Sequence, residues 1–135
     1  HLEKLKNNVK NNVSFLGQID KSQIQSAISF FDVCYIGWHN HSLYRFGISP
    51  NKIFDYMYAG KPIIHSVNTI NDFVEIADAG ISIPPENPKE IASVISKISK
   101  IEDKKLKEWG KNGKKYVEEN HTFSHLTELL ISTFE

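Results

Sequence analysis

Residues 46–62 read Phe-Gly-Ile-Ser-Pro-Asn-Lys-Ile-Phe-Asp-Tyr-Met-Tyr-Ala-Gly-Lys-Pro, and the fold prediction starts from this stretch. Ser49 is a good helix N-cap. Pro50 suits the first helical position, because the amide that proline lacks has no partner there. The helix is predicted to run to Ala59, and Gly60 supplies the left-handed residue that commonly ends a helix. A helix with signals at both ends therefore lies near the middle of the chain.

Short apolar runs and helical patterns alternate on both sides of this helix. The runs favour strands because they are rich in β-branched residues and are bounded by Gly, Pro, Asn or Asp. Strands are predicted at 13–16, 33–36, 62–67 and 81–83. Further helices are predicted at 22–31, 87–98, 103–119 and 122–134. Asp20 with Gln23, and Asn87 with Glu90, resemble N-caps paired with the third helical residue.

Strands that alternate with helices predict an α/β fold, with a Rossmann-like parallel sheet and flanking helices. Four strands are few for such a sheet, and residues 1–10 resemble the end of a helix. We therefore expect residues 1–135 to be part of one domain whose upstream portion is missing. Within it, residues 1–100 form the βα core and residues 101–135 the C-terminal helices.

Composition and charge exclude several classes of function. The chain has 135 residues, with 16 Lys+Arg against 16 Asp+Glu, and Arg45 is its one arginine. This balance lacks the basic footprint of a nucleic-acid binder, so no nucleic-acid partner is expected. Cys34 is the one cysteine, which excludes an internal disulfide framework and a cysteine-based zinc site. We expect a cytoplasmic protein.

The predicted helix at 50–59 is placed to bind an anion. It follows the strand at 33–36 through a loop, so it begins at the carboxyl edge of the sheet, where open α/β sheets bind ligands. Its first amides and Lys52 favour a phosphate, and Asp55 on the same face can accept hydrogen bonds from sugar hydroxyls. Phosphate next to a polyol describes a nucleotide sugar. Taken alone, Asn51, Lys52 and Asp55 fit a solvated helix surface better than a ligand site.

The segment from Gly47 to Pro62 resembles the nucleotide-sugar-binding segment of group 1 (family 4) glycosyltransferases of the GT-B architecture. It is most similar to the subset that builds bacterial surface polysaccharides (O-antigen or capsule), in which the pattern Gly-Ile/Val-Ser-Pro-Asn-Lys-Leu/Ile-Phe-Asp-Tyr-Met-x-x-Gly-Lys-Pro recurs. Four further stretches resemble family motifs in the same order: 12–17, 31–33, 80–88 and 109–117. The resemblance implies the partial C-terminal, donor-binding domain of such an enzyme.

The resemblance implies roles for particular residues and leaves the catalytic residue unassigned. Ile48, Ser49 and Lys52 would face the donor diphosphate, Asp55 and Asn51 the ribose or sugar, and the turn Gly17, Gln18 and Ile19 the base. No metal or other cofactor is implied beyond the nucleotide-sugar donor. Gly47 departs from the family, since many relatives carry at this position a glutamate that contacts the donor sugar.

The implied reaction is retaining transfer of a sugar to a lipid-linked surface-polysaccharide acceptor, and we expect the donor to be UDP-linked. The acceptor would bind an N-terminal domain that this chain lacks, so the chain alone is expected to be inactive. The parent enzyme would sit at the cytoplasmic face of the inner membrane. The apolar side of the helix at 122–134 would favour self-association.

Other readings of the sequence are weaker. A nucleotide-sugar 2-epimerase-like isomerase would show an Asp-Ser-Gly-Gly loop where residues 48–51 read Ile-Ser-Pro-Asn. A non-catalytic nucleotide-sugar-binding module remains an alternative. His39 and His41 lie two residues apart in a loop, with no cysteine or acidic cluster, which argues against a metal site. His65, in a strand, is interpreted as a core or edge residue rather than a base.

Overall fold

Three parallel strands form the centre of the computed structural model, which describes residues 6, 9 and 12–134. They are β1 (Cys34–Gly37), β2 (Ile63–Ser66) and β3 (Gly80–Ile83), in the spatial order β1-β2-β3. Cys34 lies opposite Ile63, which lies opposite Gly80. All three strands run in the same direction, so their carboxyl ends meet at one edge of the sheet, as the alternation of strands and helices predicts.

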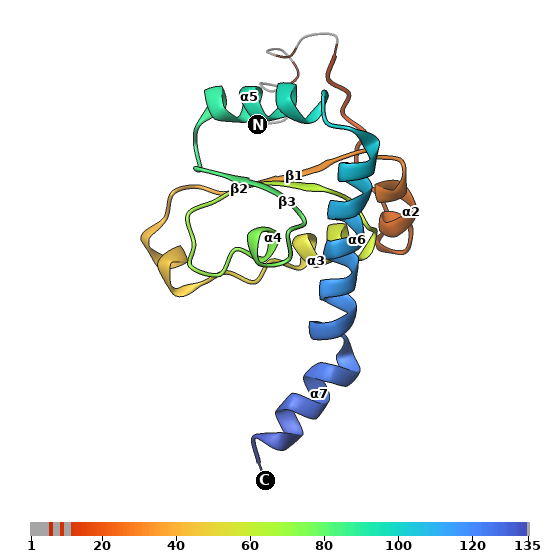
Figure 1. The fold of residues 1–135 in the computed structure, drawn as a ribbon, viewed down its shortest axis with the longest axis vertical. Helices are drawn as coiled ribbons and strands as arrows, with labels where there is room; N and C mark the ends of the chain where they lie inside the picture. The colour runs from red at the N-terminus through yellow and green to blue at the C-terminus, as the bar shows by residue number, and fades with distance from the viewer. Residues whose placement is uncertain (1–5, 7–8, 10–11, 135) are drawn as a thin grey trace.

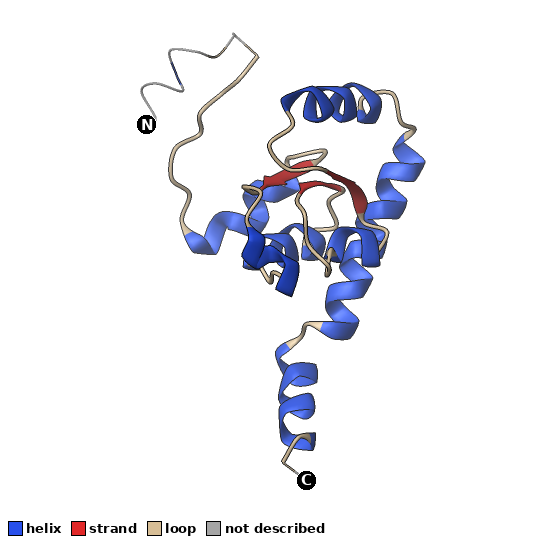
Figure 2. Cartoon of the chain, turned by 90° about the vertical axis from the view of Figure 1, so that its left-hand side faces the viewer, coloured by secondary structure: helices blue, strands red, loops and turns tan. Residues whose placement is uncertain are grey.

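Helices cover both faces of this sheet (Figure 1). The helical segments are η1 (Lys21–Gln23), α2 (Ile24–Ser29), η2 (Ser42–Phe46), α3 (Asn51–Tyr58), α4 (Phe73–Ile76), α5 (Pro88–Ile98), α6 (Asp103–Asn120) and α7 (Phe123–Ser132). Figures 1 and 2 place α5 on one side of the sheet and α3 and α4 on the other. The fold is therefore the predicted α/β, Rossmann-like arrangement.

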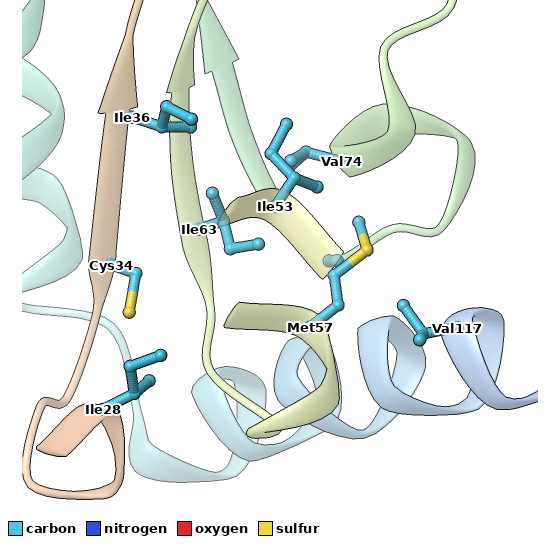
Figure 3. Packing of buried hydrophobic residues seen from close by; sticks show 9 residues of the cluster. Ile28, Cys34, Ile36, Ile53, Met57, Ile63, Val74 and Val117 are labelled. Atoms are coloured by element: carbon cyan, nitrogen blue, oxygen red, sulfur yellow. The ribbon is translucent and has the colours of Figure 1, made fainter. Parts of the chain in front are cut away.

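The larger apolar core lies between the sheet and α3 (Figure 3). Ile53 and Met57, one turn apart on α3, are both 0% exposed. They pack with residues of the sheet and of α2, α4 and α6: Ile28, Cys34, Ile36, Ile63, Val74, Ala79 and Val117. Full burial of an isoleucine or methionine side chain contributes about 1.5–3 kcal/mol. Two such anchors hold α3 firmly on the sheet.

A second core joins the opposite face of the sheet to α5. Ile64 and Ile83 on the strands pack against Val94 and Ile98 on the helix. The predicted N-cap is confirmed, because the Asn87 side chain accepts a hydrogen bond from the Glu90 amide at 3.2 Å. Capping satisfies one of the free amides at the start of α5.

The predicted strand at 13–16 is wrong. Residues 13–19 have no regular secondary structure, and Leu16 is 67% exposed. A strand is stabilised by neighbouring strands more than by its own composition, and this run pairs with neither edge of the sheet. The predicted helix end at 1–10 lies outside the described residues, apart from Lys6 and Val9.

Two predicted helix starts also need correction. Helix α3 begins at Asn51 with Pro50 as its N-cap residue, one position later than predicted, so Ser49 does not cap it. Asp20 precedes a 3-10 turn and its side chain makes no capping hydrogen bond. Both differences are small because helix ends depend on loop geometry that the local sequence only partly determines.

Helix α7 points away from the rest of the fold (Figure 2). Its apolar side chains are exposed, with Phe123 at 92% and Leu129 at 53%. Self-association through this helix stays a prediction. Among the described residues, no helix combines the length and apolar character needed to span a bilayer.

Candidate functional site

The start of α3 meets the loop that follows β2. The chain leaves β1, passes through η2 and reaches Gly47, Ile48 and Ser49 immediately before α3. Residues 67–72 leave the carboxyl end of β2 and lie against this segment, as the hydrogen bonds of Thr69 and Asn71 show. The structure therefore places the start of α3 at the carboxyl edge of the sheet, where the sequence predicts a ligand site.

The Asn71 side chain binds the peptide groups of Ile48 from two sides. Its Oδ1 accepts a hydrogen bond from the Ile48 amide at 2.8 Å, and its Nδ2 donates one to the Ile48 carbonyl at 2.8 Å. Its Oδ1 also accepts from the Thr69 hydroxyl at 2.8 Å. The Ile48 amide is therefore already paired, which corrects the expectation that it is free to face a diphosphate. The Asn71 side chain is therefore engaged with the backbone.

Gly47 has a backbone conformation that requires glycine. Its φ is +106°, a value that residues with a side chain rarely adopt. A Cβ at this position would also lie 3.1 Å from the Asn71 Oδ1 and 3.2 Å from its Cγ. The departure from the family pattern at this position is therefore tied to the Asn71 contact.

Several polar groups at the start of α3 remain open. In the described part of the chain, the amides of Ser49, Asn51 and Lys52 have no protein acceptor. Ser49, Asn51 and Lys52 are exposed, whereas Asp55 is half-buried one turn further along. Side chains three residues apart share a helix face, so Lys52 and Asp55 can contact one ligand. The arrangement combines anion donors with a carboxylate acceptor.

The predicted base-binding turn stands apart from these groups. Gly17, Gln18 and Ile19 are all exposed, and Gly17 has a φ of +78°. No hydrogen bond in the described structure joins them to the start of α3. The predicted diphosphate and ribose residues lie together at the start of α3, and the role of this turn stays a prediction.

A polar cavity of about 490 Å³ lies next to the Asn71 contact, at the carboxyl ends of β2 and β3. Its lining comes from β3, from α4 and from the loops that follow all three strands: Asn40, Val67, Asn68, Thr69, Asp72, Glu75, Ser82, Ile83, Pro84 and Pro85. Most of these residues are missed by motif reasoning. Their position in the sequence could have identified most of them, because they end a predicted strand or lie in the segment that follows one.

Asp72 is held between the sheet and α4 by a buried chain of hydrogen bonds. Trp38 Nε1 donates to His65 Nε2 at 3.0 Å, so the other ring nitrogen of a neutral His65 carries the proton and donates to Asp72 at 2.8 Å. Asp72 also accepts from the Val74 amide at 2.9 Å, which caps α4. His65 is 0% exposed, which confirms it as a core residue.

This chain of hydrogen bonds determines the charge of Asp72. Burial alone would raise the pKa of the carboxyl group, but the hydrogen bonds from His65 and the Val74 amide outweigh it and hold the pKa below its ordinary value. Asp72 is therefore ionised at neutral pH. Because His65 is enclosed, it cannot itself reach a substrate, and it acts by orienting the loop at 67–72 through Asp72.

The two loop histidines each have a structural partner. The His39 ring lies 2.9 Å from Glu86 Oε1, and this hydrogen bond holds the pKa of Glu86 below its ordinary value. His41 accepts a hydrogen bond from the Leu43 amide at the start of η2. Within the described ranges, no three His, Cys, Asp or Glu side chains gather as metal ligands would.

Comparison with known proteins places the chain in a family. Residues 1–100 match the family model described as glycosyl transferases group 1. A sucrose-phosphate synthase from Thermosynechococcus elongatus shares the fold, with a TM-score of 0.77 and 22% sequence identity over 98% of this chain. The chain spans 33% of the length of that protein. No curated protein matches. Since the family model covers well over half of its residues, the chain belongs to the group 1 glycosyl transferases.

Proposed function

We propose that this chain is the donor-binding part of a retaining glycosyltransferase that uses a nucleotide sugar, with UDP as the nucleotide. The observation that carries the proposal is the start of α3. There, unpartnered amides and Lys52 lie one turn from Asp55 at the carboxyl edge of the sheet, in a chain of the group 1 family. A second domain would supply the acceptor site, for which we propose a lipid-linked surface-polysaccharide acceptor at the cytoplasmic membrane face.

The groups at the start of α3 fit the charge that develops during transfer. When the bond to the donor sugar breaks, the negative charge on the leaving diphosphate increases. Amide hydrogens at a helix start and the positive dipole end stabilise such charge, and Lys52 adds a full positive charge. Donors that point at the leaving group before the reaction need no reorganisation during it. Ser49 and Lys52 are therefore the proposed diphosphate ligands.

The acceptor groups near this helix fit hydroxyl-rich parts of the donor. The Asp55 carboxylate can accept hydrogen bonds from the ribose, and Asn51 can both donate and accept. The polar cavity beside Asn71 supports placement of the sugar there, because amide and carboxylate groups from the loops after β1 and β2 and from α4 line it. A hydroxyl-rich ligand is the chemical class that such a lining binds best.

Titration with UDP, GDP and several UDP-sugars by isothermal calorimetry tests the proposal. We expect Lys52→Ala to weaken UDP binding roughly ten- to hundredfold, because a hydrogen bond to a charged group contributes about 1.5–3 kcal/mol. Asp55→Ala is expected to weaken binding of UDP but not of inorganic pyrophosphate, which lacks the ribose.

Lys89→Ala is the matched control. Lys89 is the second residue of α5, as Lys52 is of α3, and both side chains are exposed. Its removal is expected to leave UDP affinity unchanged. Undiminished UDP affinity in both Lys52→Ala and Asp55→Ala, or absence of nucleotide binding by the unsubstituted protein, would contradict the proposed function.

A further inference from the structure

We propose that Asn71 is a positioning residue for the donor diphosphate, which it orders through the backbone of Ile48. The proposal rests on the proposed function, because it concerns the same site. It adds a residue outside the motif at 46–62 and a physical reason for the glycine at position 47. Asn71 need not touch the donor.

The contact between Asn71 and Ile48 replaces backbone pairing that the loop lacks. The amide side chain matches the donor and acceptor of the Ile48 peptide groups at 2.8 Å each. In the described residues, neither group of Ile48 has another protein partner. The loop before α3 would otherwise be free to rotate about Gly47, since glycine has the least restricted backbone. Asn71 therefore fixes the direction in which the following amides point.

Asn71 is itself held from the sheet side. Its Oδ1 accepts from the Thr69 hydroxyl, which also lies 3.0 Å from the Tyr44 carbonyl in η2. The next residue, Asp72, is bound to buried His65 on β2 and to the Val74 amide on α4. A side chain anchored on both sides in this way can orient a neighbouring loop.

Gly47 provides the backbone turn that the contact between Asn71 and Ile48 requires. With φ at +106° it turns the chain so that the Ile48 peptide faces Asn71. A Cβ at position 47 would lie only 3.1–3.3 Å from the Oδ1, Cγ and Nδ2 atoms of Asn71. Position 47 therefore strongly favours glycine as long as Asn71 binds Ile48. This coupling predicts that substitution at either position disturbs the same amides.

The variant test compares Asn71→Ala with Asn120→Ala, a change to an exposed asparagine at the end of α6 whose side chain also donates to a backbone carbonyl. We expect Asn71→Ala to weaken UDP binding about tenfold. This is the effect of losing roughly one net hydrogen bond, here through the disorder of the loop before α3. Uridine binding is expected to stay within twofold in both variants. A general structural defect would weaken UDP and uridine alike, and that result, or unchanged UDP affinity in Asn71→Ala, overturns the proposal.

Amide hydrogen exchange on the unsubstituted protein tests the same idea without a variant. We expect the Ile48 amide to be protected before any nucleotide is added, and the Ser49, Asn51 and Lys52 amides to become protected only with UDP. An Ile48 amide that exchanges as fast as that of Ser49 overturns the proposal, even if Asn71→Ala fails to fold. If the protein binds UDP but Asn71→Ala binds it equally well, the positioning role fails and the proposed function stands. If the unsubstituted protein binds no nucleotide, both fail.

Discussion

Replacing Gly110 with alanine is expected to destabilise the protein, although the same change stabilises most helices. Gly110 is buried on α6, where it packs against Gly60, the residue that ends α3. A Cβ built on Gly110 would overlap the Gly60 carbonyl oxygen and lie 2.8 Å from its carbonyl carbon. Backbone atoms cannot rotate away as a side chain can, so α6 must move.

Gly60 cannot yield in place of α6. Its φ of +67° is the left-handed conformation that ends a helix, and its amide donates to the Met57 carbonyl at 2.9 Å. The next amide, of Lys61, donates to the Tyr56 carbonyl at 3.1 Å. These two bonds fix the turn that leads from α3 into β2.

The expected magnitude is the difference of two effects. Alanine in place of glycine in a helix interior contributes about 1 kcal/mol of stability. Overpacking a filled site costs about 1–3 kcal/mol, and we place Gly110→Ala in the upper part of this range, at about 2–3 kcal/mol, because the overlap is with backbone atoms. The net expectation for Gly110→Ala is a loss of roughly 1–2 kcal/mol in the free energy of unfolding.

Urea denaturation followed by circular dichroism measures this loss, and Gly113→Ala is the control on the same helix. A Cβ at Gly113 would lie 3.1 Å from the Ala79 Cβ and 3.2 Å from the Met57 Cγ, of which methionine can adjust. We therefore expect Gly113→Ala to be less destabilising than Gly110→Ala. The reasoning is refuted if Gly110→Ala is as stable as the unsubstituted protein, because the gain from helix propensity would then outweigh the overlap.

Two further predictions concern stability. Asp72→Ala removes the α4 cap and leaves the His65 ring donor buried without a partner, so we expect a loss of about 2–4 kcal/mol in the same urea assay, and a loss under 1 kcal/mol would contradict this account. His121 lies beside the rings of Phe54 and Tyr116, and burial, with a smaller contribution from the charge of a neighbouring histidine, lowers its pKa. Because the pKa of His121 is lowered in the folded state, the unfolded protein binds the proton more readily. The free energy of unfolding is therefore unaffected by His121 above its ordinary pKa of about 6.5 and falls as the pH drops below that value. Unfolding free energy measured at pH 7 and at pH 5 is expected to differ less in His121→Phe than in the unsubstituted protein.

The elements that local sequence determines were predicted well. Helix α3 and its ending at Gly60 follow from residues within the segment, and the structure confirms the left-handed turn. Strands β1, β2 and β3 lie within a residue or two of the predicted runs. The run at 13–16 has the same composition, yet it forms no strand because pairing depends on neighbours that composition does not reveal.

The candidate site divides in the same way. Ser49, Lys52 and Asp55 are close in sequence, so a motif is enough to group them. The contacts that order them link residues far apart in the chain. Asn71 and Ile48 are 23 positions apart, and Trp38 and His65 are 27 positions apart. Such pairs form only when parallel strands bring their following loops to one edge, so no local pattern predicts them.

These long-range contacts form one continuous chain from the sheet to the start of α3. Trp38 at the end of β1 binds His65 on β2, His65 binds Asp72, and the adjacent Asn71 binds Ile48. The orientation of the amides that follow Ile48 is therefore set by buried strands and by the loop after β2, and not by the motif in which those amides lie. Groups ordered before the ligand arrives lose less conformational freedom on binding, so more of each contact would appear as affinity for the proposed diphosphate. The motif at 46–62 therefore contains the proposed diphosphate-binding groups, whereas the sheet and the loop after β2 determine how those groups are oriented.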